Sequence, residues 1–498
     1  MKKSSKFFKS LLIMTPMWVM SGCSDFLEKP LQSQLTQENF PTTASDALLA
    51  TNAVYNILRI NLYHQGLFPI LDIMSDDAHK GSNPDDAAAT IGPYDNFTHI
   101  PTEGSLSRWW NTLYEGVKRS NVVIQLVPAI SMDATLRNRY IGEAQFLRAL
   151  FYFDLVRAWG GVPIVTGTAP SLDLTRDTSE DVYAIIEADL LDAIEMLPEK
   201  SDYSSKDLGR ATKGAAKALL AKVYLFQGDW ANAEKYSLEV IQSGQYDLEE
   251  NFSDANSEAG EHGVESVFEI GATRFESVQN GGNPYANVQG VRGMPNRGWG
   301  FNRPSLDLQE AFEEGDPRLD ATVIYLGEEL DGITIVGDGS TPDETRDEND
   351  NLLQIECYNQ KVWTAGNDVP TQFGHNRRII RYADVLLMAA EALTRNNKPE
   401  DALIHLNEVR ERARGDVPEL LPDITETDTN LLLEIILHER RIELALEGHR
   451  FWDLVRTGKA SAVLGSLGFI QDKHELLPIP QSETDLTQNV IGQNNNWE

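Results

Sequence analysis

Apolar residues recur at helical spacing along much of the chain, and the strongest pattern lies in residues 139–163. Two neighbouring apolar stripes run along this segment: Tyr140, Ala144, Leu147, Phe151, Leu155 and Ala158, and beside them Phe146, Ala149, Leu150, Phe153 and Val156. A helix that is apolar on most of its circumference is normally buried between other elements. Gly160-Gly161 ends the pattern, and Pro163 prevents the helix from resuming. We expect this helix to be the centre of an α-helical domain.

The same periodicity predicts further single helices and two helix pairs. The single helices are expected at 44–60, 105–127, 178–197, 431–446 and 450–457. The pairs are expected at 209–244, where Asp229 is a plausible N-cap for the second helix, and at 381–413. Both pairs match the spacing of tetratricopeptide-type helix pairs, at Ala221, Tyr224, Gly228 and Ala233 and at Ala390, Ala402 and Val409. Because other sequence separates the pairs, a regular solenoid is not expected.

Two stretches lack helical periodicity. Residues 72–105 are rich in Asp, Gly and Pro and predict a long, partly ordered loop region. In residues 246–374 glycine is frequent, and only short strands are expected, at 266–270 and 321–326. This second stretch also contains an acidic loop at 338–351. Loops of this length in a compact domain are usually functional or disordered.

The N-terminus has the pattern of an export signal. Four lysines within the first nine residues precede an apolar run at 11–20, which is about half the ~20 residues that a spanning helix needs. Ser21-Gly22-Cys23 follows and resembles a bacterial lipoprotein cleavage site. We therefore predict a signal peptide at 1–22, lipidation of Cys23 and a tether at 23–40. The only other cysteine is Cys357, so a lipidated Cys23 excludes an intrachain disulfide.

The charge of the chain limits its partners. The formal net charge is −33, and affinity for nucleic acid depends on Lys and Arg side chains that neutralise phosphates. We therefore expect no nucleic-acid partner and no docking on an anionic membrane surface. The plainer interpretation of the charge is solubility.

The sequence does not match the common motifs of catalysis or of metal binding. The chain has no P-loop and no dinucleotide fingerprint, and Ile442 stands where a zinc protease that began at His438 would need its second histidine. Residues 347–351 begin like a calcium loop, but Leu352 replaces the turn glycine and Tyr358 the bidentate glutamate. We expect no catalytic residue, no cofactor and no metal site. A calcium ion bound by carboxylates from separate loops stays an alternative.

Several blocks, in order along nearly the whole chain, resemble the SusD/RagB family of outer-membrane nutrient-binding lipoproteins. They are 23–28 (CSDFLE), 143–149 (EAQFLRA), 159–163 (WGGVP), 209–215 (GRATKGA), 316–318 (DPR), 381–388 (RYADVLLM), 439–443 (ERRIE), 448–453 (GHRFWD) and 477–480 (LPIP). Each block alone has modest specificity, and their combination is specific.

This resemblance implies a mainly α fold, in which tetratricopeptide-like helix pairs pack against a loop-rich irregular region with a few short strands. It implies one domain at 41–498, with helix pairs mainly at 41–245 and 376–460 and an irregular insert at 246–375. It also implies a non-enzymatic protein, anchored by lipid in the outer membrane and facing the cell exterior. Such proteins bind glycans or peptides and deliver them to a TonB-dependent, SusC-like transporter.

Charged residues inside the apolar helical stretches are better explained as structural ion pairs than as catalytic groups. They are Arg148, Asp154, Arg157, Arg440, Arg441, Glu443, Arg450 and Asp453. Trp159 and Trp452 are likewise expected in the core, and His449 is expected to be a hydrogen-bonded structural residue.

Glycan recognition needs exposed aromatic rings beside planar polar side chains, because sugar C–H groups stack on rings while amides and charged groups bind the hydroxyls. Two loop regions have this mixture, 76–110 and 280–303. The candidate ligand-binding residues are Trp299, Tyr285, Tyr94, Trp109, Asn283 and Arg292. Trp299 lies between Gly298 and Gly300, which would leave its ring accessible, although such a tryptophan can also be folded inward.

Three hypotheses about function remain open at this stage. The first is a surface glycan-binding lipoprotein, with a peptide in place of the glycan as a variant. The second is a helix-pair adaptor that binds another protein. The third is a secreted glycoside hydrolase. Exposed aromatic side chains gathered on one loop face would favour the first hypothesis over the second.

Overall fold

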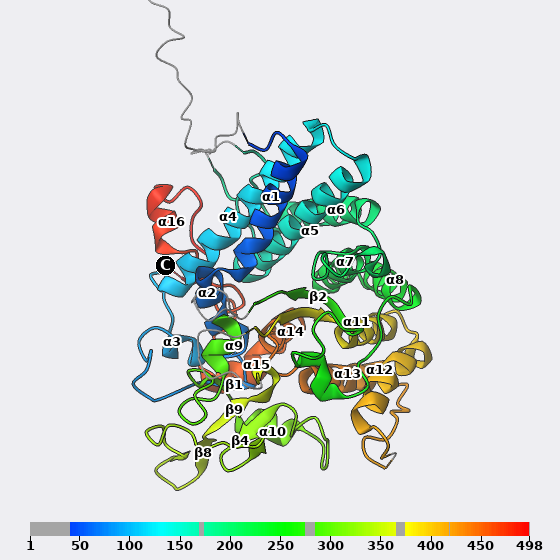
Figure 1. Cartoon of the computed structure of the whole chain (residues 1–498). Coiled ribbons are helices and arrows are strands. Elements are labelled where there is room, and N and C mark those ends of the chain that lie inside the picture. The colour runs from blue at the N-terminus through cyan, green and yellow to red at the C-terminus, as the bar shows by residue number, and fades with distance from the viewer. Residues whose placement is uncertain (1–39, 169–173, 274–283, 365–373, 418, 498) are drawn as a thin grey trace, which may run out of the picture. The chain divides into compact units, whose positions relative to one another are not determined.

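The computed structural model describes residues 40–168, 174–273, 284–364, 374–417 and 419–497 (Figure 1). The predicted signal peptide, Cys23, the tether as far as residue 39 and Asn283 lie outside the described residues. All helices and strands of the described residues lie in the unit Pro41–Glu498.

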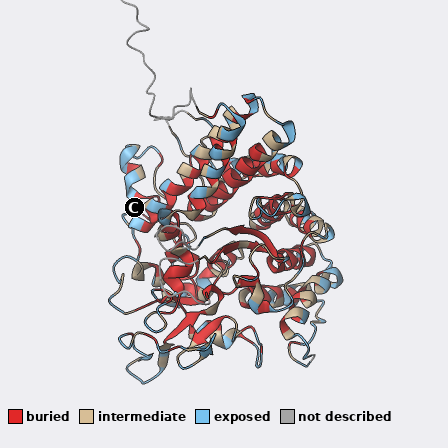
Figure 2. Cartoon of the chain, viewed as in Figure 1, coloured by how far each residue is buried: buried red, intermediate tan, exposed pale blue. Residues whose placement is uncertain are grey.

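The central helix expected from the sequence is α5 (Ala134–Trp159). The Asp133 side chain caps it by accepting a hydrogen bond of 2.9 Å from the backbone N–H of Leu136. Its residues from 140 onward are almost all buried (Figure 2) between α4 (Gly104–Leu126) and α6 (Ser179–Met196). At Gly116 of α4, an added methyl group would lie 2.5 Å from the Phe151 ring, so glycine permits this close helix contact. The prediction of a buried central helix is confirmed.

The two predicted helix pairs are also present. The first is α7 (Lys213–Gln227) with α8 (Trp230–Gln242), and Asp229 caps α8 through the backbone N–H of Asn232. The second is α11 (Tyr382–Arg395) with α12 (Pro399–Arg414). Although other sequence separates the pairs, α8 packs directly on α11 (Figure 1). The pairs are therefore continuous in space.

The remaining helices complete the mainly α fold that the sequence predicts. They are α1 (Ala44–Tyr55), α2 (Asn61–Leu71), α3 (Gly92–Asp95), α9 (Pro284–Gln289), α10 (Leu306–Ala311), α13 (Thr429–Glu443), α14 (Arg450–Arg456), α15 (Ala460–Leu464) and α16 (Gln481–Leu486), with short 3-10 turns between some of them. The periodicity does not predict α2, because Pro69 lies inside it and no side chain caps its start.

The strands are short and form two-stranded antiparallel pairs in the described part of the chain. They are β1 (Ala78–Gly81) with β3 (Phe301–Pro304), β2 (Ser266–Ile270) with β10 (Arg377–Arg381), β4 (Val323–Tyr325) with β9 (Cys357–Asn359), β5 (Glu329–Leu330) with β6 (Ile333–Thr334), and β7 (Glu344–Arg346) with β8 (Leu352–Ile355). The strand predicted at 266–270 is confirmed. The partly ordered loop region expected at 72–105 contains the short elements β1 and α3. The acidic loop expected at 338–351 includes the strand β7, which its sequence did not predict.

The eight charged residues predicted to be structural all form ion pairs. The pairs are Arg148–Asp189, Arg157–Asp154, Arg440–Asp453, Arg441–Asp77, Arg450–Asp76 and Arg381–Glu443. Trp159 and Trp452 are buried as expected. His449 is a neighbour of Lys222, at 3.3 Å between Nδ1 and Nζ, and burial lowers its pKa to about 3.

Arg381 belongs to a buried charge cluster around Glu443. It lies where β10 runs into α11 and contacts Glu265, Glu443 (3.1 Å) and Glu447 (2.7 Å). Arg412 of α12 bridges two of the same carboxylates, Glu265 at 2.8 Å and Glu443 at 2.5 Å. The cluster therefore joins β2, β10, α12 and α13.

Replacing Arg381 with methionine tests this cluster. The change leaves the buried carboxylates of Glu265, Glu443 and Glu447 without their shared cation. Loss of one partner of a buried ion pair typically costs 3–5 kcal/mol, so we expect the free energy of unfolding to fall by about 3–5 kcal/mol. Urea-induced unfolding followed by circular dichroism measures this change.

Arg346→Met is the matched control. Its ion pair with Glu344 lies in the β7–β8 hairpin, and 41% of the arginine side chain is exposed. Exposed pairs contribute about 0–1 kcal/mol, so this variant should unfold close to wild type. Equal losses in the two variants would contradict the structural role of Arg381.

Candidate functional site

Trp299 is an aromatic side chain presented to solvent by a tight loop, and 41% of it is exposed. Its backbone N–H donates to the carbonyl of Asn287 at 3.1 Å, and that of Gly298 donates to Val291 at 2.8 Å. An added Cβ at Gly298 would lie 2.5 Å from the Asn287 carbonyl oxygen, and Gly300 has a φ of +72°. Both flanking positions therefore require glycine, and the loop holds the indole at the surface.

Arg292 joins three loops beside this tryptophan. Its guanidinium pairs with Asp86 and with Asp338, and it donates to the Ser82 hydroxyl at 2.7 Å. Ser82 donates its backbone N–H to the carbonyl of Gly300 at 2.6 Å, which closes the contact with the Trp299 loop. Burial acts to lower the pKa of Arg292, but the hydrogen bonds that it donates to the two carboxylates raise it, so the guanidinium stays charged.

Asp338 organises the third loop. Its Oδ1 accepts backbone N–H groups of Ser340 at 2.9 Å and Thr341 at 2.7 Å. Burial acts to raise the pKa of Asp338, but these backbone hydrogen bonds and Arg292 lower it well below its usual range. Asn83 donates its side-chain amide to the Ser340 carbonyl at 3.3 Å. These bonds hold guanidinium, carboxylate and amide groups beside the loop that bears Trp299, which they meet at Gly300.

Two exposed apolar side chains lie two residues from Arg292 and Asp338 in the sequence. Met294 and Val336 are both more than half exposed, and their backbones pair through Met294 N–H to the Gly337 carbonyl at 2.9 Å and Val336 N–H to the Met294 carbonyl at 2.8 Å. We call Trp299, Met294 and Val336, with the polar groups of Ser82, Asn83, Asp86, Arg292, Asp338 and Ser340, the Trp299 surface.

Three other predicted binding residues are not at the surface. Tyr94 is fully buried and stacks on His99, with ring centroids 5.0 Å apart. Trp109 is fully buried against Trp159 at 5.2 Å. Tyr285 is 5% exposed, and its hydroxyl donates to the Leu446 carbonyl at 3.1 Å. Burial of these rings contradicts the expectation that they are exposed stacking platforms.

The sequence analysis missed most of the polar neighbours of Trp299. Asp86 and Asp338 are 252 residues apart in sequence, and both pair with Arg292. Both aspartates lie in polar, acidic loops, which pointed to a functional region. The loop composition did not show that the two carboxylates share one arginine. Met294 and Val336 carried no signal, because single apolar residues in loops are common.

Metal binding and membrane crossing find no support in the described residues. Within them, no group of three or more His, Cys, Asp or Glu side chains is arranged to bind a metal ion. None of the helices in the described ranges is both long and apolar enough to span a membrane.

Comparison with known proteins defines the class of this chain. A model of the SusD family matches residues 264–497, and a model described as "Starch-binding associating with outer membrane" matches residues 25–225. SusD-like protein P2 of Formosa agariphila is 31% identical over 523 residues, with 99% of both chains covered.

Solved structures agree with this class. A laminarin-binding SusD-like protein has a TM-score of 0.77 and 31% identity, and the match covers 91% of this chain and 100% of that one. Surface glycan-binding protein A from Bacteroides thetaiotaomicron, in complex with laminarihexaose, has a TM-score of 0.76, 27% identity and coverage of 91% and 100%. Both matches define a mainly helical, SusD-like fold with tetratricopeptide-like pairs. The chain belongs to the SusD family.

Arg292→Gln tests whether this arginine holds the three loops together. We expect faster amide hydrogen exchange in residues 80–86 and 337–341, because both loops lose their shared guanidinium. The free energy of unfolding should change by less than about 1 kcal/mol, since the ion pairs are partly exposed. Mass spectrometry of deuterium uptake measures the exchange. Unchanged uptake in both loops, with Arg346→Gln as the control, would show that Arg292 does not join them.

Proposed function

We propose that this protein is a non-catalytic lipoprotein that binds glycans at the Trp299 surface. The observation that carries the proposal is the exposed indole of Trp299, fixed by glycine-dependent loop geometry beside a polar frame. An indole face packs against the C–H groups of a sugar ring, and the neighbouring planar polar groups bind its hydroxyls. The open arrangement suits one or a few sugar units of a long chain.

The relatives support a glucan as the ligand class. One solved relative is named as laminarin-binding, and another was solved with laminarihexaose. Both are matched across 91% of this chain. The Arg292 cluster does not argue against a neutral polysaccharide, because its guanidinium is offset by two carboxylates.

Delivery to a transporter completes the proposed role. The protein would be attached through lipid on Cys23, face the cell exterior and pass its glycan to a SusC-like, TonB-dependent transporter in the outer membrane. The family membership and the description of one matched model as associating with the outer membrane support this location. Binding would require no cofactor, no metal and no nucleic acid.

Trp299→Ala tests the binding surface. Loss of the stacking face should weaken binding of laminarin oligosaccharides by about tenfold or more, which corresponds to about 1.4 kcal/mol. Trp299→Phe should retain part of the affinity, because a smaller ring still stacks. Isothermal titration calorimetry, with starch and mannan oligosaccharides and a mixed peptide pool in the same panel, measures the affinities.

Trp230→Ala is the control, because Trp230 is a half-buried tryptophan at the start of α8 and packs under Arg395. It should bind glycans as wild type does. Wild-type affinity in Trp299→Ala would remove the Trp299 surface from the binding site. Binding of peptides and of no glycan by the wild type would overturn the proposed ligand class.

Cys23→Ala tests the lipid anchor. In a bacterial host, wild type should incorporate an alkyne-labelled fatty acid and fractionate with the outer membrane. The variant should lose the label, because the thiol predicted to carry the lipid is gone and the remaining thiol, that of Cys357, is buried. Ser24→Ala, one position later, should label normally. A fatty-acid label that persists in Cys23→Ala would contradict lipidation at this residue.

A further inference from the structure

A small polar cavity lies where the helical scaffold meets the strand β10. Its volume is about 30 Å³, which gives room for a water molecule or a monatomic ion and is far below the ~300 Å³ of the smaller pockets for organic ligands. Its walls come from α2, α5, α7, β10 and the turn at 447–449 before α14. The charged lining residues and one histidine are Asp154, Arg157, Lys222, Arg377, Glu447 and His449.

Arg377 is the charged side chain of this lining that lacks a partner. The residue is 7% exposed, and its Nε and Nη1 are buried donors without a hydrogen bond to any described residue. No carboxylate of the described ranges forms an ion pair with it. Its guanidinium lies over the ring of Tyr285, 4.7 Å from the centroid, but a contact with the ring face leaves the in-plane N–H groups free.

The other charged groups of the lining have partners of opposite charge. Arg157 pairs with Asp154 at 2.6 Å, and Lys222 pairs with Asp384 at 3.0 Å. Glu447 is bound by two cations that lie outside the cavity. Arg377 therefore adds a positive charge that no group of the lining offsets.

Asp72 is the acidic residue that could offset Arg377 from a longer distance. It does not line the cavity, and its carboxylate accepts hydrogen bonds from the backbone N–H of Gly448 at 2.9 Å and the amide of Asn302 at 3.3 Å. Burial raises the pKa of Asp72 to about 7, although the charge of Arg377 acts in the opposite direction. Asp72 therefore carries only part of a negative charge at neutral pH.

Two further N–H donors line the cavity with Arg377. Burial lowers the pKa of His449 to about 3 and keeps it neutral, and its Nδ1 accepts from the Lys222 ammonium at 3.3 Å. A neutral imidazole that accepts at Nδ1 carries its proton on Nε2, so Nε2 is a donor. The Lys222 ammonium has three N–H groups, and Asp384 and His449 take two of them. Donors from three parts of the chain therefore line one small volume.

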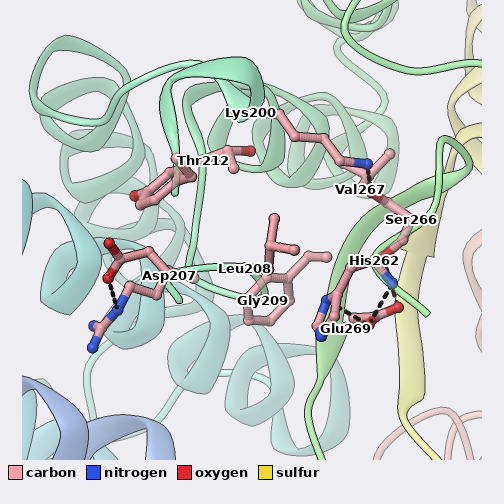
Figure 3. A pocket seen from close by; sticks show the side chains of 12 residues that line it. Lys200, Asp207, Leu208, Gly209, Thr212, His262, Ser266, Val267 and Glu269 are labelled. Carbon is pink, nitrogen blue, oxygen red and sulfur yellow. Dashed lines mark hydrogen bonds and ion pairs between the residues drawn. The ribbon is translucent and has the colours of Figure 1, made fainter. Parts of the chain in front are cut away.

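Another pocket of about 30 Å³, beside β2, shows how charged groups are paired elsewhere in the fold (Figure 3). There, the carboxylate of Glu269 lies 2.7 Å from His262 Nδ1. Lys200 donates to the backbone carbonyls of Gly263 and Ser266. Arg377 differs from these groups because no protein acceptor is placed opposite its buried donors.

We propose that the cavity beside Arg377 holds a small monovalent anion of the size of chloride. The Arg377 guanidinium would bind it, together with N–H donors of Lys222 and His449. A water molecule would accept the same hydrogen bonds but would leave the buried charge of Arg377 uncompensated, which is costly. The anion would connect β10 to α5, α7 and the start of α14. The inference does not depend on glycan binding, because the cavity shares no residue with the Trp299 surface.

Crystals of the mature protein grown with sodium bromide test the site directly, because bromide can replace chloride and scatters X-rays anomalously. We expect an anomalous peak in the cavity within hydrogen-bond distance of Nε or Nη1 of Arg377. An ordered water at this place, without an anomalous peak, would overturn the inference.

Thermal unfolding tests whether the anion also binds in solution. Chloride replaces gluconate at constant sodium concentration and ionic strength, and gluconate is too large for a cavity of this volume. An ion that binds only the folded state stabilises it, so the Tm of wild type should rise by about 1–2 °C for each tenfold increase in chloride above its dissociation constant. Scanning calorimetry measures the Tm. A bromide peak without any such rise would show binding at crystal concentrations only, and would contradict the proposal.

Arg377→Gln should lose both the chloride dependence of the Tm and the bromide peak, because the buried positive charge is removed. Arg346→Gln is the control, since this arginine is exposed and pairs with Glu344, and its Tm should respond to chloride as that of wild type does. A chloride response that persists undiminished in Arg377→Gln would overturn the role of Arg377. If Arg377→Gln folds too poorly to measure, the two wild-type experiments decide the question.

Discussion

Buried ion pairs centred on Glu443 are the interaction on which the rest of the structure depends. This carboxylate, at the end of α13, contacts three arginines from different parts of the chain: Arg318 at 3.2 Å, Arg381 at 3.1 Å and Arg412 at 2.5 Å. Burial acts to raise the pKa of Glu443, but these positive charges lower it. A carboxylate with a lowered pKa stabilises the fold above its unfolded pKa, and that stabilisation is lost as the pH falls toward the folded pKa. Desolvation opposes such pairs, but removal of one partner leaves an uncompensated buried charge, so each partner is needed once the other is in place.

Ion pairs also connect the helices to the loops. Asp76 and Asp77, just before β1, pair with Arg450 and Arg441 of the C-terminal helices. β1 then pairs with β3, which directly follows the Trp299 loop. The Trp299 surface therefore lies on irregular backbone that ion pairs connect to the helical scaffold. This explains how long loops can present a fixed tryptophan.

Helical periodicity was enough to predict the scaffold, and local sequence was not enough to predict the site. The apolar stripes of α5 and the helix pairs follow directly from residue spacing, as does the structural role of charges such as Arg148 and Asp154. The exposure of Trp299 could be predicted because the two flanking glycines limit how its loop can fold. Tyr94 and Trp109 could not be distinguished from it, because the direction of an aromatic ring in a polar segment is set by distant partners, His99 and Trp159. The Asp86–Arg292–Asp338 cluster depends on loop contacts across the chain that no local pattern encodes.

A crystal structure of the protein with a bound laminarin oligosaccharide is the most direct test of the central claim. The account predicts a sugar ring stacked on the indole of Trp299, with its hydroxyls within hydrogen-bond distance of the groups around Arg292 and Asp338. It also predicts that the buried rings of Tyr94, Trp109 and Tyr285 stay in their packed positions. An oligosaccharide bound elsewhere, with the Trp299 ring left uncovered, would contradict it.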